Sequence, residues 1–114
     1  MELDIKARRC FPRMVIRAPI RFQVRGQAEA YQGLCDNISA GGLGFSCDRF
    51  IAPLSTLMLE INILSRVLRP VGKVAWAQDL PRSFRSRLGV EFIEMDPAEK
   101  NYLGDYIGLH AGQL

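Results

Sequence analysis

The sequence predicts an all-β domain that ends in a helix, and three observations support this fold class. Most of the chain alternates apolar and polar residues with the period of two that marks half-buried strands. Turn residues such as Gly26 and the pair Gly41-Gly42 separate the alternating segments. After Asp96 the apolar residues recur at intervals of three and four, as in an amphipathic helix. At 114 residues, the chain is expected to form a single domain over 1–114.

Six alternating segments are expected to form strands, each with one apolar face. Short connections between them favour antiparallel neighbours, because a parallel crossover needs a dozen or more residues. A six-stranded antiparallel β-barrel buries six one-sided strands and leaves few open edges. The expected strands are 20–25, 28–38, 43–48, 57–63, 73–76 and 87–92.

A basic N-terminal arm over residues 1–19 is expected before the barrel (20–95), and a helix over 96–110 after it. Prolines prevent a helix in the arm, which is predicted to be extended or irregular. Asp96 and Pro97 supply an N-cap acid and a first-turn proline for the C-terminal helix. Its stripe of Tyr, Leu and Ile residues is expected to pack on the barrel or, alternatively, on a partner.

The charge is unevenly distributed along the chain. Residues 1–25 hold seven cations and two anions, a net +5, whereas residues 91–114 hold one cation and five anions, a net −4. The formal net charge of the whole chain is +3. The excess in the arm therefore favours an anionic partner.

Several classes of protein are not expected from this composition. No apolar run approaches the ~20 residues of a membrane-spanning helix, and the first residues lack the apolar stretch of a signal peptide, so a cytoplasmic protein is predicted. Cys10, Cys35 and Cys47 show no CxxC spacing, and His110 is the single histidine, so neither a disulfide framework nor a metal site is expected. No arrangement of nucleophile, base or phosphate-binding glycines stands out. The chain is therefore not expected to be an enzyme or to need a cofactor.

Two short segments are unusual for purely structural elements. Arg8, Arg9 and Arg13 crowd next to a proline, and guanidinium groups suit phosphates and guanine bases. The segment 36–42 places Asn, Ser and Gly side by side at the end of a strand. Taken alone, the first is also explained by a solvated basic tail, and the second by a turn whose Asn and Ser side chains cap its own amides.

Together the two segments resemble the PilZ domain family, whose hallmark is RxxxR followed about twenty to thirty residues later by [D/N]xSxxG. RxxxR reads Arg9-Cys10-Phe11-Pro12-Arg13 here, and the second motif reads Asn37-Ile38-Ser39-Ala40-Gly41-Gly42. The similarity continues through Gly42-Leu43-Gly44-Phe45, Val74-Ala75-Trp76 and Gly89-Val90-Glu91-Phe92. It thus spans essentially the whole chain.

The resemblance implies a split-barrel fold and a receptor for the bacterial second messenger cyclic di-GMP. Arg9 and Arg13 would clamp phosphates and guanines, and Asn37 and Ser39 would offer hydrogen bonds from the barrel rim. Gly42 would allow the backbone to approach closely.

Further residues would extend this site. Arg8 would stack on a second ligand molecule if cyclic di-GMP binds as a stacked pair, and Gly41 and Trp76 are secondary candidates. Trp76 shares an apolar face with Val74 in the predicted strand, so it is alternatively a core residue. Where many members have Asp, this chain has Asn37, which lacks the charge that best accepts from the N1 and N2 donors of guanine.

The output of such a receptor is expected to be protein contact. Arm, barrel and helix use all 114 residues, so a stand-alone member would order its arm on the ligand and then meet an unidentified protein target. One alternative is a ligand-independent adaptor, although adaptors of the family usually lack one or both motifs. Another is a small basic barrel for single-stranded nucleic acid, which would expose aromatic residues along a groove. A nucleic acid polymer is not expected because the aromatics mostly alternate inward, and Arg49, Arg82, Arg85 and Arg87 are interpreted as a solvated face.

Overall fold

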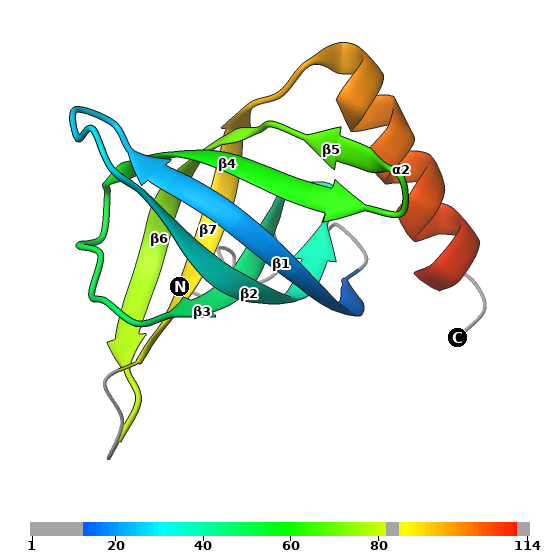
Figure 1. The fold of residues 1–114 in the computed structure, drawn as a ribbon. Coiled ribbons are helices and arrows are strands. Elements are labelled where there is room, and N and C mark those ends of the chain that lie inside the picture. Colours follow the sequence, from blue (N-terminus) through cyan, green and yellow to red (C-terminus); the bar gives the residue numbers. More distant parts are fainter. Residues whose placement is uncertain (1–12, 82–84, 112–114) are drawn as a thin grey trace, which may run out of the picture.

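The computed structural model describes residues 13–81 and 85–111, which form one sheet and one helix (Figure 1). The arginines Arg8 and Arg9 lie outside the described residues. The strands are β1 (Met14–Val24), β2 (Ala30–Ser39), β3 (Gly42–Cys47), β4 (Thr56–Ile63), β5 (Arg66–Leu68), β6 (Val71–Asp79) and β7 (Ser86–Glu94), and the helix is α2 (Pro97–Ala111).

The sheet closes on itself as a barrel. Its strand order is β1-β2-β3-β7-β6-β4-β5, every pairing is antiparallel, and β1 also pairs with β4. The β1–β4 pairing joins six strands into a closed ring and leaves β5 as an extra strand beside β4. The predicted six-stranded antiparallel barrel with a C-terminal helix is therefore confirmed.

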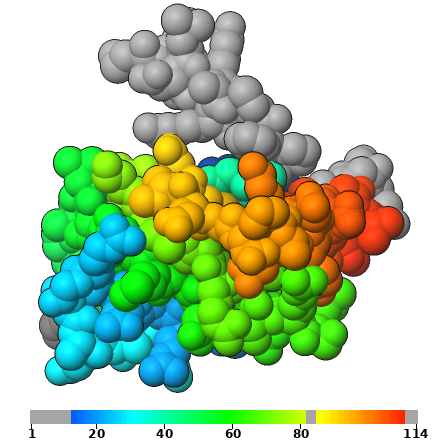
Figure 2. Space-filling view, turned by 90° about the horizontal axis from the view of Figure 1, so that it is seen from above, coloured from blue at the N-terminus to red at the C-terminus, as the bar shows by residue number. Residues whose placement is uncertain are grey.

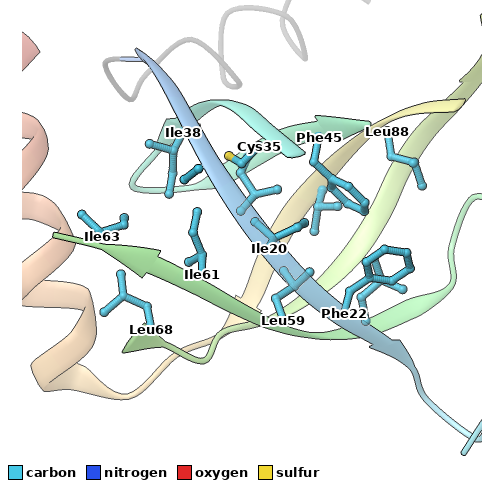
Figure 3. Close-up of a cluster of buried hydrophobic side chains, with 14 of the residues drawn as sticks. Ile20, Phe22, Cys35, Ile38, Phe45, Leu59, Ile61, Ile63, Leu68 and Leu88 are labelled. Atoms are coloured by element: carbon cyan, nitrogen blue, oxygen red, sulfur yellow. The ribbon is translucent and has the colours of Figure 1, made fainter. Parts of the chain in front are cut away.

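The core lies inside the ring, where the apolar faces of the strands meet. Ile20 and Phe22 on β1 lie beside their register partners Ile61 and Leu59 on the adjacent strand β4, and Phe45 on β3 belongs to the same cluster (Figure 3). The Phe22 and Phe45 rings pack at a centroid distance of 5.1 Å. Because the inner face is filled by the core, only the outer surface of the barrel is open to a ligand.

Strand β1 begins at Met14, whereas the sequence pattern places the start of the barrel at residue 20. Met14 and Ala18 are buried and β1 pairs with β2 along this stretch, with a register shift between Val15 and Ala18. Pairing with β4 begins only at Ile20, so Pro19 lies where β1 has a single neighbour and a proline is tolerated. Part of the predicted arm is thus built into the sheet.

Of the four register shifts in the sheet, two are bulges next to predicted site residues. In β2 the register with β3 shifts between Cys35 and Asn37, and in β6 the register with β7 shifts between Val74 and Trp76. A bulge sets two residues of one strand against one of its partner and re-aims the side chains that follow. Both bulges change which residues reach the outer surface.

Helix α2 packs across one end of the barrel, beside β5 (Figures 1 and 2). The Asp96 carboxylate caps it by accepting from the Ala98 amide at 2.8 Å. Leu103 and Ile107 are buried in the core, and the Tyr102 hydroxyl donates to the Ile63 carbonyl at 2.9 Å. The predicted packing of the helix stripe is confirmed, and within the described residues no helix is long and apolar enough to cross a membrane.

Candidate ligand-binding site

The structure brings together one residue from each of the two sequence motifs. Arg13, just before β1, donates from Nη1 to the Asn37 Oδ1 atom on β2 at 2.5 Å. The two residues are separated by 24 positions in the sequence, and the antiparallel pairing of β1 with β2 makes them neighbours. Arg13 is exposed and Asn37 half-buried, so this contact lies on the outer surface.

Asn37 stands at one end of a row that crosses four adjacent strands. Asn37 on β2 pairs with Gly44 on β3, Gly44 pairs with Gly89 on β7, and Gly89 pairs with Trp76 on β6. Neighbouring strands lie about 4.8 Å apart, so the row is roughly 14 Å wide. We call this row of four residues the glycine floor, because Gly44 and Gly89 lie between the Asn37 amide and the Trp76 indole.

The two glycines are required by the side chains that lie over them. A Cβ atom at Gly44 would come within 2.7 Å of the Asn37 amide nitrogen. A Cβ atom at Gly89 would come within 2.2 Å of the Trp76 indole nitrogen. Asn37 and Trp76 therefore rest directly on the backbone of the neighbouring strands.

Trp76 does not share the inward face of Val74, contrary to the alternation in the sequence. The β6 bulge turns Trp76 outward, so it is 39% exposed while Val74 is fully buried. An exposed, flat indole beside a glycine floor is suited to stacking on a nucleobase.

The other motif residues build the turn between β2 and β3. The Ser39 hydroxyl, only 2% exposed, accepts from the Gly41 amide at 3.2 Å and donates to the Gly42 carbonyl at 3.4 Å. A Cβ atom at Gly42 would lie 2.1 Å from the Val90 carbonyl oxygen, so this glycine allows close approach of the β7 backbone. Ser39 caps its own turn, as the structural interpretation of this segment anticipates.

An ion pair that the sequence pattern did not indicate adjoins Asn37. Asp36 accepts from both Nη atoms of Arg87 on β7, the Nη2–Oδ1 distance being 3.0 Å, and it also accepts from the Asn37 amide at 2.6 Å. Arg87 is therefore half-buried and paired rather than part of a solvated face. The available signal was the pair of consecutive polar residues Asp36-Asn37 inside an alternating strand.

The remaining cations of the predicted solvated face have local contacts. Arg85 donates to the Ser46 hydroxyl at 3.1 Å, and the Arg49 guanidinium lies 3.6 Å from the Tyr31 ring centroid. Arg82 lies outside the described residues. None of these contacts joins the glycine floor.

Cys35 lies directly beneath the β2 bulge. Its thiol donates to the Asn37 carbonyl at 3.3 Å, and burial raises the pKa of Cys35 to about 12. Burial likewise raises the pKa of Cys47. Such thiols are poor nucleophiles at neutral pH, and the part of the chain that the structure describes holds no cluster of His, Cys, Asp and Glu side chains able to bind a metal ion.

Two hollows are present elsewhere on the described surface. One, of about 360 Å³, lies over β1 and β4 between Arg21, Met58 and Arg69. The other, of about 310 Å³, lies between Ala40 and the start of α2 at Lys100. Neither hollow is lined by Asn37, Gly44, Gly89 or Trp76.

Solved structures with the same fold come from several bacteria. The inhibitor of motility MotI/DgrA of Bacillus subtilis matches 85% of this chain and 48% of its own at a TM-score of 0.74 and 20% identity. The PilZ domain of YcgR from Escherichia coli with c-di-GMP matches 93% of this chain and 92% of its own, at a TM-score of 0.71 and 13% identity. PlzA of Borreliella burgdorferi in complex with c-di-GMP matches 97% of this chain and 56% of its own, at a TM-score of 0.58 and 15% identity.

The chain spans about half the length of MotI, and at these identities the likeness concerns the fold. Comparison with curated proteins gives no match. The family model described as "PilZ domain" matches residues 7–109, which is nearly the whole chain. The chain therefore belongs to the PilZ domain family.

Proposed function

We propose that this protein is a receptor for cyclic di-GMP that binds the ligand on the glycine floor between Asn37 and Trp76. The observation that carries the proposal is the contact between Arg13 and Asn37, which joins the two motifs on the outer surface. Two neighbours of the same fold, the YcgR PilZ domain and PlzA, were solved with c-di-GMP.

The chemistry of the floor fits a guanine nucleotide. Arg13 supplies paired N–H donors for a phosphate or for the O6 and N7 atoms of guanine. The Asn37 Oδ1 atom has a second lone pair for a guanine N–H donor. Trp76, which is 39% exposed and lies over Gly89, offers a face for stacking.

The arm supplies the rest of the site in this proposal. Arg9, four residues before Arg13, clamps a phosphate or a guanine of the ligand together with Arg13, and Arg8 stacks on a second molecule if the ligand binds as a pair. Ordering of the arm consumes part of the binding energy and presents a new surface to a protein target. The cytoplasmic location stays a prediction from the sequence.

Isothermal titration calorimetry with cyclic di-GMP tests the proposal. The wild type should bind, and Asn37→Ala and Arg9→Ala should each weaken binding by about tenfold or more. Asn62→Ala is the matched control, because Asn62 is exposed on β4 outside the floor, and it should bind like the wild type. A wild type that does not bind, or an Asn37→Ala variant with unchanged affinity, would contradict the proposal.

The same titrations measure stoichiometry. A stacked pair predicts two ligands per chain for the wild type and one for Arg8→Ala, because the extra guanidinium is the group assigned to the second molecule. One ligand per wild-type chain would remove Arg8 from the site and leave the receptor itself intact.

A further inference from the structure

Asp36 and Asn37 are adjacent in the chain, yet both side chains reach the outer surface. In a regular strand they would point to opposite faces. The bulge removes this alternation: Cys35 and Ile38 are fully buried, while Asp36 and Asn37 between them are half-buried. The two polar side chains can therefore hydrogen-bond to each other.

Their hydrogen bonds leave the Asn37 amide only one orientation. Its Nδ2 donates to the Asp36 Oδ1 atom at 2.6 Å, and its Oδ1 accepts from Arg13. The flipped amide would place an oxygen against the Asp36 carboxylate and an NH₂ group against the Arg13 guanidinium, so both hydrogen bonds would be replaced by repulsion. The side-chain oxygen of Asn37, Oδ1, thus faces Arg13.

Arg87 holds Asp36 in place for this contact. It reaches from β7 across β3 and donates to both carboxylate oxygens of Asp36. This bidentate geometry fixes the plane of the carboxylate. The Asp36 side chain is only 34% exposed, so the ion pair is partly shielded from solvent. The orientation of Asn37 is therefore determined from two strands away.

We propose that Asp36 and Arg87 are positioning residues that make the site select guanine over adenine. They do so by holding the side-chain oxygen of Asn37, Oδ1, toward the ligand. This inference rests on the proposed function, since it concerns the base of the dinucleotide bound on the same floor. It also assigns Asp36 the task of making an asparagine behave as an acceptor, as an aspartate would.

The selectivity follows from the edges of the two bases. Guanine presents adjacent N1–H and N2–H donors, which a fixed carbonyl oxygen accepts. Adenine presents an acceptor at N1, which would face that oxygen unfavourably. A freely turning amide would bring its NH₂ group to adenine N1 and bind both bases, so discrimination depends on the amide being held.

The experiment compares affinities for cyclic di-GMP and cyclic di-AMP by calorimetry. The wild type should prefer cyclic di-GMP by about a hundredfold, and Asp36→Ala and Arg87→Ala should each lower that ratio by about tenfold. Some preference remains in both variants, because Arg13 still favours the O6 and N7 atoms of guanine. Asp48→Ala is the matched control, as Asp48 is an exposed aspartate paired with Arg49 away from the floor, and its ratio should stay within twofold of the wild type.

Asn37→Asp separates positioning from a general structural role. A carboxylate accepts in either orientation, so in an Asn37→Asp background the further change Asp36→Ala should leave the ratio unchanged. If Asp36 has a merely structural role, Asp36→Ala weakens the binding of both dinucleotides equally. The ratio of the two affinities then stays constant when residue 37 is Asn, and Asn37→Asp does not restore the lost affinity. Thermal unfolding of each variant verifies that it is folded. If Asp36→Ala does not fold, Arg87→Ala takes its place in the test.

The outcomes distinguish this inference from the proposed function. Binding of cyclic di-GMP by the wild type with an equal ratio in Asp36→Ala and Arg87→Ala would overturn the positioning role alone. Equal wild-type affinity for the two dinucleotides would also overturn it. A wild type that binds neither dinucleotide would overturn the proposed function and this inference with it.

Discussion

Two groups of arginines lie on the outer surface of the same barrel and differ in their surroundings. Arg13 and Arg87 contact Asn37 and Asp36 beside the glycine floor. Arg17, Arg21 and Arg25, which continue the spacing of four residues along and just beyond β1, are exposed. Within residues 13–81 and 85–111 these three make no side-chain hydrogen bond or ion pair.

The difference shows that arginine content alone does not make this site. Arg21 faces Gln32 on β2 and Glu60 on β4, whose strands alternate regularly at that point. Arg13 lies beside the bulge, where β2 presents two polar side chains next to a pair of glycines. The proposed site thus coincides with an irregularity of the sheet, and the predictions below test whether binding follows that irregularity.

The largest expected effect separates Arg13 from Arg21. Arg13→Ala should weaken cyclic di-GMP binding by about 1–3 kcal/mol, because a two-pronged contact to guanine or phosphate is lost. Arg21→Ala removes the same charge from an exposed position within β1 and should change affinity by less than twofold. Calorimetry of both variants checks this, and equal losses would mean that the ligand responds to general positive charge.

A second prediction concerns the glycine floor. Gly89→Ala should push the Trp76 indole from its place and weaken binding by about 1.4 kcal/mol, as loss of one stacked base would. Trp76 is the only tryptophan, so its fluorescence reports the displacement directly. An unchanged emission spectrum together with unchanged affinity would show that the floor does not position the indole.

The third prediction tests how the core supports the bulge. The pKa of Cys35 is raised to about 12 in the folded protein. The contribution of this thiol to the free energy of unfolding is therefore complete below the ordinary thiol pKa and is lost as the pH rises toward the pKa of the folded state. The free energy of unfolding should fall by about 1 kcal/mol between pH 9 and pH 10 from this thiol. Urea unfolding of Cys35→Ala should lack that part of the pH dependence, and identical slopes would argue against the buried thiol.

The smallest effect is expected at a glycine outside the site. Gly104 lies in the exposed part of α2, and a Cβ atom there would have no neighbour within 4 Å. Gly104→Ala should therefore stabilise the protein by up to about 1 kcal/mol and leave ligand affinity unchanged. Thermal unfolding measures the gain, and a destabilised variant would reveal a packing role for Gly104.

The regular parts of the barrel could be predicted from the sequence, because alternation determines which face of a strand is buried. Leu57, Leu59, Ile61 and Ile63 alternate without interruption, and all four lie in the core. The three-residue strand β5 was missed because it is too short to show a period. The helix was predictable from the Asp96 cap and its apolar stripe.

The site was predictable only where the motif names its residues. At the β2 bulge, the consecutive polar pair Asp36-Asn37 is a readable signal. At the β6 bulge, Trp76 is apolar and continues the alternation of Val74, so no pattern reveals that it turns outward. The partner of Asp36 is Arg87, 51 positions away, and that pairing follows from strand order rather than from any local pattern.

The central claim is that cyclic di-GMP binds where the bulge and the glycine floor meet. Titration of ¹⁵N-labelled protein with cyclic di-GMP, followed by NMR, tests it most directly. The account predicts the largest shifts at the Asn37 side-chain amide, the Gly44 and Gly89 backbone amides and the Trp76 indole N–H. Shifts concentrated at Arg21 and Met58 instead, with the floor unaffected, would contradict it.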